Sequence, residues 1–203
     1  MDKREYIRRI SSAAEQYEKN LHGKAFLFVG RNNKDGSLSD LEAVFPKAQF
    51  MHLVGASSSL SASRFFDACI GHELKPDELE VSTEKQMRLK LEVIDHILKL
   101  PWTARMMGTF NGSGSYLYTE KFAGSQIACM GFVRIEGQPY YLPNTVLKAD
   151  IRSKTDLAQQ ILAVYWKPER ESLYQKEPTR VAAALLGKVL FWPNEIANKI
   201  SSI

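Results

Sequence analysis

Short apolar segments joined by tight turns place the strongest constraint on the fold of this 203-residue chain. Residues 24–30 and 41–45 have strand character, and residues 31–36 between them are rich in Asn, Asp and Gly, which tolerate the positive φ of tight turns. Strands joined by short turns pair in antiparallel fashion, because a parallel pair needs a long crossover. The sequence therefore predicts a meander of antiparallel strands.

Helices are predicted on both sides of this meander. Residues 3–21 carry apolar side chains at three- and four-residue steps, the spacing of an amphipathic helix. The same reasoning predicts helices at 62–72, at about 84–100, at 146–152, at 179–190 and from 193 onward. Further strands are predicted at 49–55, 115–119, 125–135, 138–142 and in the second half of 157–166.

One histidine lies inside the predicted strand 49–55. Alternation along a strand puts Phe50, His52 and Val54 on one face. An imidazole has an ordinary pKa near 6.5, so it can give or take a proton near neutral pH. The alternative interpretation is a half-buried histidine that donates to a backbone carbonyl.

Composition narrows the class of protein. Hydrophobic residues make up 44% and charged residues 25% of the chain, which is ordinary for a soluble globular domain. The net charge of +4 permits an anionic partner such as RNA or DNA without demanding one. Cys69 and Cys129 show no metal-ligand spacing and fit a reducing compartment. With no secretory signal and no apolar run of membrane-spanning length, we expect a cytoplasmic protein without membrane contact.

Six short sequence segments carry a family resemblance, in an order that makes coincidence improbable. They are residues 24–30 (Lys-Ala-Phe-Leu-Phe-Val-Gly), 50–55 (Phe-Met-His-Leu-Val-Gly), 60–66 (Leu-Ser-Ala-Ser-Arg-Phe-Phe), 116–124 (Tyr-Leu-Tyr-Thr-Glu-Lys-Phe-Ala-Gly), 131–133 (Gly-Phe-Val) and 140–150 (Tyr-Tyr-Leu-Pro-Asn-Thr-Val-Leu-Lys-Ala-Asp). Over roughly residues 15–175 the chain resembles the phage Barnase–EndoU–colicin E5/D–RelE-like (BECR) nucleases, and within them the fourth subgroup.

The resemblance implies an α+β fold in which N-terminal helices pack on a curved antiparallel β-sheet, the BECR-like RNase fold. On this basis residues 1–175 form the nuclease domain, and residues 176–203 form a C-terminal helical extension. The resemblance also implies a phage- or toxin-associated endoribonuclease that needs no metal and no cofactor. Its substrate would be RNA, and a neutralising protein partner is conceivable for such a toxin.

Metal-independent RNA cleavage turns the ribose 2′-hydroxyl into a nucleophile against the adjacent phosphate. The reaction needs a base, an acid for the leaving 5′-oxygen, and cations or N–H donors for the charge on the phosphorane. The residues expected to act in catalysis are His52, Lys121 and Tyr118, and those expected to bind substrate are Tyr116, Asn144, Thr145 and Arg134. Plainer interpretations remain open for three of them: a helix N-cap for Asn144 or Thr145, and a solvated side chain for Arg134.

Two other functions remain open at this point. The basic charge balance and the unmatched C-terminal segment also suit a catalytically inactive module on the same fold, one that binds or inhibits a host or phage protein or RNA. An ADP-ribosyltransferase-like enzyme is the third interpretation, since such domains also combine a strand histidine with nearby aromatic residues.

Overall fold

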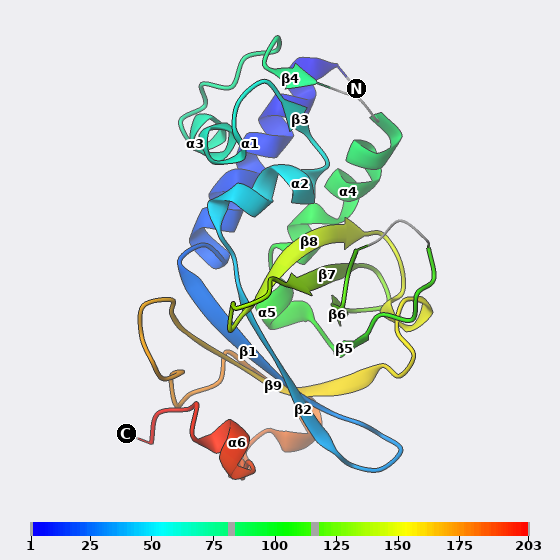
Figure 1. The fold of residues 1–203 in the computed structure, drawn as a ribbon, viewed down its shortest axis with the longest axis vertical. Helices are drawn as coiled ribbons and strands as arrows, with labels where there is room; N and C mark the ends of the chain where they lie inside the picture. The colour runs from blue at the N-terminus through cyan, green and yellow to red at the C-terminus, as the bar shows by residue number, and fades with distance from the viewer. Residues whose placement is uncertain (1, 81–83, 115–117, 203) are drawn as a thin grey trace.

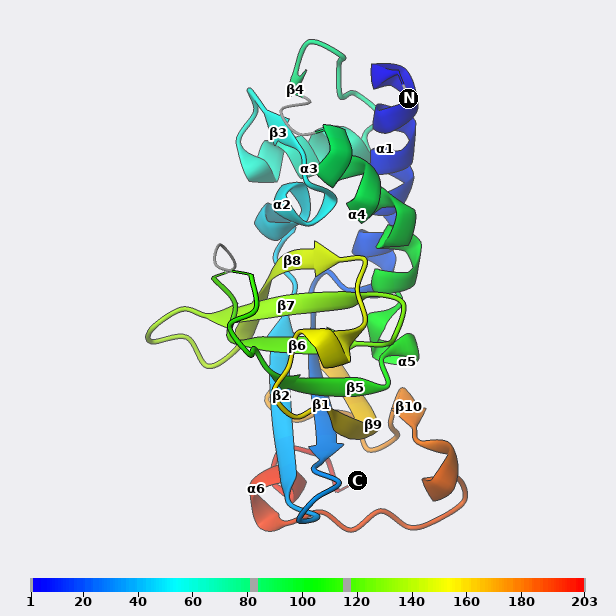
Figure 2. The ribbon, with the colours of Figure 1, turned by 90° about the vertical axis from the view of Figure 1, so that its right-hand side faces the viewer.

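The computed structural model describes residues 2–80, 84–114 and 118–202 of the chain. It has an α+β fold: the long helices gather at one end, a curved sheet fills the middle, and the C-terminal segment lies at the opposite end (Figures 1 and 2). The helices are α1 (Lys3–Asn20), α2 (Phe50–Val54), α3 (Ala62–Ile70), α4 (Glu84–Ile97), α5 (Leu100–Thr103) and α6 (Asn194–Ala197), with 3₁₀ turns η1 (Lys47–Gln49), η2 (Ile151–Ser153) and η3 (Ala183–Leu185).

The sheet curls back on itself. Its strands are β1 (Lys24–Arg31), β2 (Leu38–Val44), β5 (Met106–Thr109), β6 (Lys121–Gly124), β7 (Cys129–Arg134), β8 (Tyr141–Leu147), β9 (Gln159–Pro168) and β10 (Arg180–Val181), while β3 (Ser57–Ser58) pairs with β4 (Leu79–Glu80) in a small second sheet. The order is β1-β2-β8-β7-β6-β5-β9-β10, and β1 also pairs with β9. Among the described strands every pairing is antiparallel except β2 with β8, which is parallel. The predicted α+β fold with a curved sheet is thus confirmed, and the sheet, predicted to be antiparallel, is mixed because of the β2–β8 pairing.

Helix α1 begins as its sequence predicts, because the Asp2 side chain accepts a hydrogen bond from the Glu5 N–H at 2.8 Å. Its apolar stripe is buried, and Tyr17 near the C-terminal end of that stripe packs against the rings of Phe50 and Phe66. The core therefore joins α1 to α2 and α3, and fixes the helical end of the molecule above the sheet (Figure 1).

The predicted strand at 49–55 is wrong, because this segment forms the end of η1 and the short helix α2. Phe50, Leu53 and Val54 are fully buried, and their spacing of three and four residues is that of one helix face. The helix ends at Gly55, which has a φ of 73°. A segment this short fits both the two-residue period of a strand and the 3.6-residue period of a helix. The packing of its apolar residues against α1 and α3 favours the helix.

The segment after the β7–β8 hairpin also differs from the prediction. Asn144 and Thr145 do not cap a helix: both lie in β8, and the predicted helix at 146–152 shrinks to η2. The ladder between β7 and β8 has an irregularity at Gly131/Phe132, opposite Pro143, and such an irregularity tolerates a proline. Pairing with β7 therefore outweighs the local helix-start signal.

Two further predictions need correction. The strand predicted at 115–119 falls partly outside the described residues, and the described strand β6 starts only at Lys121. The helix predicted at 179–190 is wrong, because this segment contains the edge strand β10 and the 3₁₀ turn η3. The last short helix is confirmed as α6.

The C-terminal segment packs on the far end of β1 and β2. Lys199 Nζ pairs with Asp40 at 2.7 Å and with Glu42 at 2.6 Å, and the Tyr174 hydroxyl donates to Glu42 at 2.9 Å. Ile196 joins an apolar cluster with residues of β1. These contacts attach the segment to the sheet, while a domain boundary at residue 175 stays a prediction.

No helix among the described residues is long and apolar enough to cross a membrane. Cys69 and Cys129 are free thiols, and both are buried in the core as their apolar sequence settings predict. Burial raises the pKa of each thiol to about 12.

Candidate active site

A hollow of about 660 Å³ lies between the helical end of the molecule and the sheet. Helices α2 and α4 form its upper wall, and β8 with the turn that follows it forms its floor (Figure 1). The lining residues are His52, Gln86, Leu89, Lys90, Ser113, Gly114, Tyr118, Asn144, Thr145, Val146, Leu147, Lys148, Ala149 and Lys154.

His52 lies on the face of α2 that borders this hollow. With Phe50, Leu53 and Val54 buried on one face, the His52 side chain projects from the opposite, solvent-exposed face. Partial burial and the charge of Lys90 lower the pKa of the imidazole, while a hydrogen bond to the main chain of Asn144 works in the opposite direction. The net result is a histidine that is neutral at pH 7 and lies against the main chain of Asn144.

Lys90 of α4 is a cation in direct contact with His52. Its ammonium donates to the His52 carbonyl oxygen at 2.7 Å, and the Gly55 N–H donates to the same oxygen at 3.1 Å. The stem of Lys90 passes so close to Gly55 that a Cβ there would lie 3.0 Å from its Cδ. Burial lowers the pKa of Lys90 to about 8. The lysine is thus charged at pH 7 but loses its proton more readily than an ordinary lysine.

Asn144 organises the floor of the hollow. Its main chain holds the imidazole of His52. Its side-chain amide donates to the Tyr118 carbonyl oxygen, and its amide oxygen accepts from the Thr119 hydroxyl at 3.1 Å. The Tyr118 ring itself is 79% exposed and free to meet a ligand. Asn144 therefore orients both the histidine and the loop that carries Tyr118.

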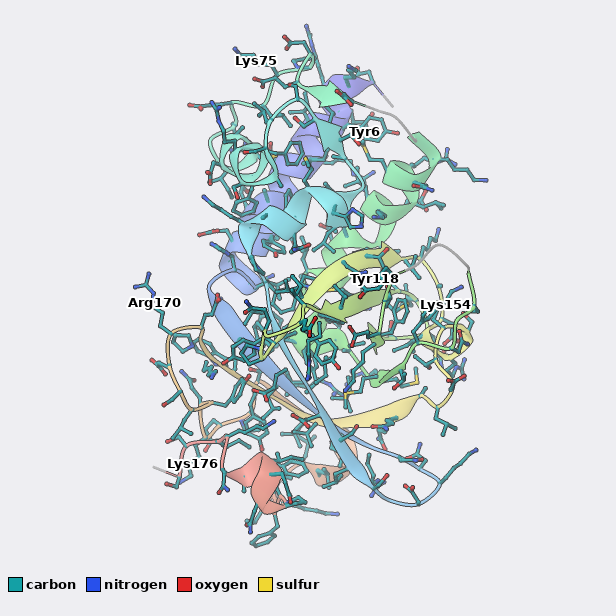
Figure 3. All side chains as sticks on the ribbon, in the orientation of Figure 1. Tyr6, Lys75, Tyr118, Lys154, Arg170 and Lys176 are labelled. Atoms are coloured by element: carbon teal, nitrogen blue, oxygen red, sulfur yellow. The ribbon has the colours of Figure 1, made fainter. Side chains whose placement is uncertain are left out.

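The charge of the hollow favours an anion. Besides His52, three lysines line it, and none of its described lining residues is acidic. Lys148 pairs with Glu92 of α4 at 2.7 Å, whereas no partner of the Lys154 ammonium is found within the described part of the chain. Figure 3 labels Tyr118 and Lys154 on the same side of the molecule. Lys90 and Lys154 thus form no ion pair with a carboxylate in the described residues, and such cations favour a phosphate-bearing ligand.

A scan against protein-family models matches residues 9–182 to the family described as phage-Barnase-EndoU-ColicinE5/D-RelE like nuclease4. The chain belongs to this nuclease family. The family expected from the six sequence segments is thus confirmed. Neither a comparison with curated proteins nor a comparison with solved structures finds a match.

Membership in a nuclease family implies a nucleic-acid substrate, and the basic hollow is a suitable place for its phosphates. The structure brings four of the seven expected site residues to this hollow, namely His52, Tyr118, Asn144 and Thr145. Thr145 is buried, and its methyl group packs over Gly131, so it shapes the floor more than it presents a hydroxyl.

The other expected residues lie elsewhere or outside the description. Lys121 donates to the Asp40 carbonyl oxygen at 3.2 Å and lies 5.1 Å from the centre of the Tyr141 ring. Arg134 lies over the same ring at 4.4 Å. Neither residue lines the hollow with His52. Tyr116 lies outside the described residues.

Sequence reasoning missed Lys90 as a site residue. Its position carried a signal, since Lys90 follows Met87 by three residues and precedes Ile94 by four, which places it beside the buried stripe of α4. A lysine beside an apolar stripe either extends toward solvent or makes a specific polar contact.

Within the described residues no group of three or more His, Cys, Asp or Glu side chains could hold a metal ion.

Proposed function

We propose that this protein is an endoribonuclease that cleaves RNA by attack of the 2′-hydroxyl on the adjacent phosphate, without a catalytic metal ion. The observation that carries the proposal is the pair of His52 and Lys90 in a hollow lined by cations and free of acidic lining residues among those described. The same proposal includes that the protein acts in the cytoplasm and that its role is associated with a phage or a toxin.

His52 acts as the acid–base group. A lowered pKa keeps its imidazole neutral at pH 7, and a neutral imidazole can take the proton of the 2′-hydroxyl. The hydrogen bond to the Asn144 main chain occupies one ring nitrogen and leaves the other for the substrate. The protonated ring then returns its proton to the leaving 5′-oxygen, directly or through water.

Lys90 stabilises the charge that develops on the phosphorane. Its ammonium uses one N–H for the His52 carbonyl oxygen, and two further N–H donors remain available. Electrostatic groups fixed before the reaction contribute more than the same groups in water, because they need no reorganisation. Lys154 adds a second cation, and the exposed Tyr118 ring can stack on a base beside the scissile bond.

The proposal is tested by incubating RNAs of several sequences with the protein in EDTA. We expect cleavage by wild type and a loss of about 10²–10⁴-fold in His52→Ala, the range for removal of a general acid or base. The matched control is His72→Asn, an exposed histidine with a φ of 56° that asparagine tolerates. Equal background cutting by wild type and His52→Ala would refute the proposal. RNA binding without cleavage would instead favour an inactive binding module.

A further inference from the structure

We infer that the protein carries a second subsite for single-stranded RNA, which holds a base against Trp102 and a phosphate near Arg105 and Arg180. The subsite is a separate hollow of about 390 Å³ between α5 and the β6–β7 turn. This inference rests on the proposed function, because it assigns flanking nucleotides of the same RNA to a place on the surface.

The two walls of this hollow are apolar and face solvent. Trp102 is 43% exposed, and its ring meets Phe26 edge-on at 6.4 Å, which fixes the orientation of the indole. Ile127 is 62% exposed and also lines the hollow. An indole and an aliphatic side chain beside one small hollow offer a stacking platform for a planar base, and such platforms tolerate any base.

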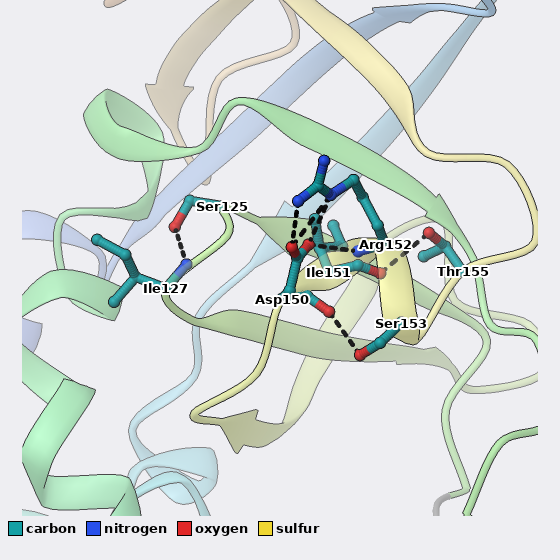
Figure 4. A network of polar contacts seen from close by, with 7 residues as sticks. All are labelled: Ser125, Ile127, Asp150, Ile151, Arg152, Ser153 and Thr155. Carbon is teal, nitrogen blue, oxygen red and sulfur yellow. Dashed lines mark hydrogen bonds and ion pairs between the residues drawn. The ribbon is translucent and has the colours of Figure 1, made fainter.

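Polar groups lie at the back of the same hollow. His96 Nε2 lies 3.1 Å from the Ser125 hydroxyl, and that hydroxyl oxygen also accepts from the Ile127 N–H at 3.1 Å (Figure 4). The Ile127 side chain points away from the Asp150–Arg152 ion pair, so it remains on the side of the turn that borders the hollow. A base in this place would find both an apolar wall and hydrogen-bonding partners.

Arg105 lines the hollow, and Arg180 contacts β9 at the residue that also pairs with Arg105. The Ile161 N–H donates to the Arg105 carbonyl oxygen at 2.9 Å, and the Ile161 carbonyl oxygen accepts from Arg180 at 3.3 Å, so both residues meet at one point of β9. Burial and the charge of Arg105 lower the pKa of Arg180 to about 10.

Neither guanidinium is paired with a carboxylate anywhere in the described part of the chain, and the buried Nε of Arg180 has no hydrogen-bond partner there. Two neighbouring guanidinium groups without carboxylate partners favour an anion such as a phosphate.

One face of α4 connects the two hollows. Leu89, Glu92 and His96 are spaced by three and four residues, so they share that face. Leu89 lines the first hollow, Glu92 pairs with Lys148 of the first hollow, and His96 lines the second. A second link is the main chain, because the Ile151 N–H, two residues after Ala149 of the first hollow, donates to the carbonyl oxygen of Ser125 of the second at 3.1 Å.

The helix sets the spacing of the two sites. The seven residues from Leu89 to His96 rise by about 10 Å at 1.5 Å per residue. A stacked strand rises by roughly 3.4 Å per nucleotide, so roughly three nucleotides span the stretch of α4 between the two hollows. The ligand is therefore a single strand that extends at least that far past the cleavage position.

The experiment measures RNA binding separately from cleavage. A fluorescein-labelled single-stranded RNA of ten nucleotides is titrated with His52→Ala protein in EDTA, and Kd is read from fluorescence anisotropy. In that background we expect Trp102→Ala to raise Kd about tenfold, within the range for loss of one stacking platform. Because Trp102 contacts Phe26, Ile127→Glu serves as a second variant at an exposed position. Arg105→Gln should lower the slope of log Kd against log salt by about one.

Matched controls lie elsewhere on the surface. Phe191→Ala removes an aromatic ring that is 86% exposed, and Arg170→Gln removes an exposed arginine; both should leave Kd within twofold. The inference is overturned if Trp102→Ala and Ile127→Glu behave like these controls, or if the parent binds no RNA. Cleavage by wild type together with unaffected binding in both variants would refute the subsite alone. Binding that depends on Trp102, without any cleavage by wild type, would refute the proposed endoribonuclease alone.

Discussion

Replacing Lys90 by methionine should make the protein more stable and at the same time much less active. Burial lowers the pKa of Lys90 from 10.5 to about 8. This difference between the unfolded and the folded pKa means that the charged lysine costs the folded state about 3 kcal/mol at pH 6.5. Loss of the hydrogen bond to the His52 carbonyl oxygen offsets roughly 1 kcal/mol, and Gly55 still donates to that oxygen. Lys90→Met should therefore gain about 2 kcal/mol at pH 6.5.

The pH dependence of this gain is the sharper test. A lysine with a lowered folded-state pKa destabilises the protein fully below about pH 8, and the cost disappears as pH rises from 8 toward 10.5. The two pKa values leave roughly 1 kcal/mol of that cost at pH 9.5, so the advantage of Lys90→Met should shrink by roughly 2 kcal/mol between pH 6.5 and 9.5. Urea denaturation of both proteins at the two pH values measures it.

The control is Lys99→Met, an exposed lysine just beyond α4 and outside the hollow. It should change stability by no more than about 0.5 kcal/mol at either pH. A stability advantage of Lys90→Met that is equal at pH 6.5 and 9.5 would refute the burial of a charged amine at this position.

Cleavage by Lys90→Met should fall by roughly 10²–10³-fold, as for loss of one charge-stabilising donor.

Three further predictions concern the same hollow. The pH profile of kcat/KM should be bell-shaped, with an acid limb below pH 6.5 from His52 and a basic limb near pH 8 from Lys90; a basic limb near pH 10 would exclude Lys90. Asn144→Ala should cost about 1–3 kcal/mol in thermal denaturation, because the Tyr118 carbonyl and Thr119 hydroxyl lose their partner; an unchanged melting temperature would contradict this. Gly131→Ala should cost about 1–3 kcal/mol in urea denaturation, since its Cβ would lie 2.7 Å from the Thr145 methyl group, and a neutral effect would show that β8 can shift.

The elements with long patterns could be predicted from the sequence. Helix α1 carries its stripe over several turns, and β1 with β2 is defined by a turn rich in Asn, Asp and Gly. The segment around His52 could not be assigned this way, because five residues fit both a strand and a helix period. Its helical form depends on the burial of Phe50, Leu53 and Val54 against α1 and α3, which the local sequence does not encode.

The candidate site was predictable only in part for a similar reason. His52 and Asn144 lie far apart in sequence, and they meet because β8 runs beneath α2. The expected cation Lys121 lies beside Tyr141 instead, since its place in β6 directs it away from the hollow. Lys90 takes the place beside His52, and only the tertiary packing of α4 on α2 brings it there.

The central claim is that His52 drives 2′-hydroxyl attack on RNA, and the chemical end of the product tests it most directly. In EDTA, wild type should leave a 2′,3′-cyclic phosphate on the 5′ fragment, detectable by mass spectrometry, and the product should fall to background in His52→Ala. The same amount of cyclic phosphate from His52→Ala, or a wild-type product that ends in a 3′-hydroxyl, would contradict the claim.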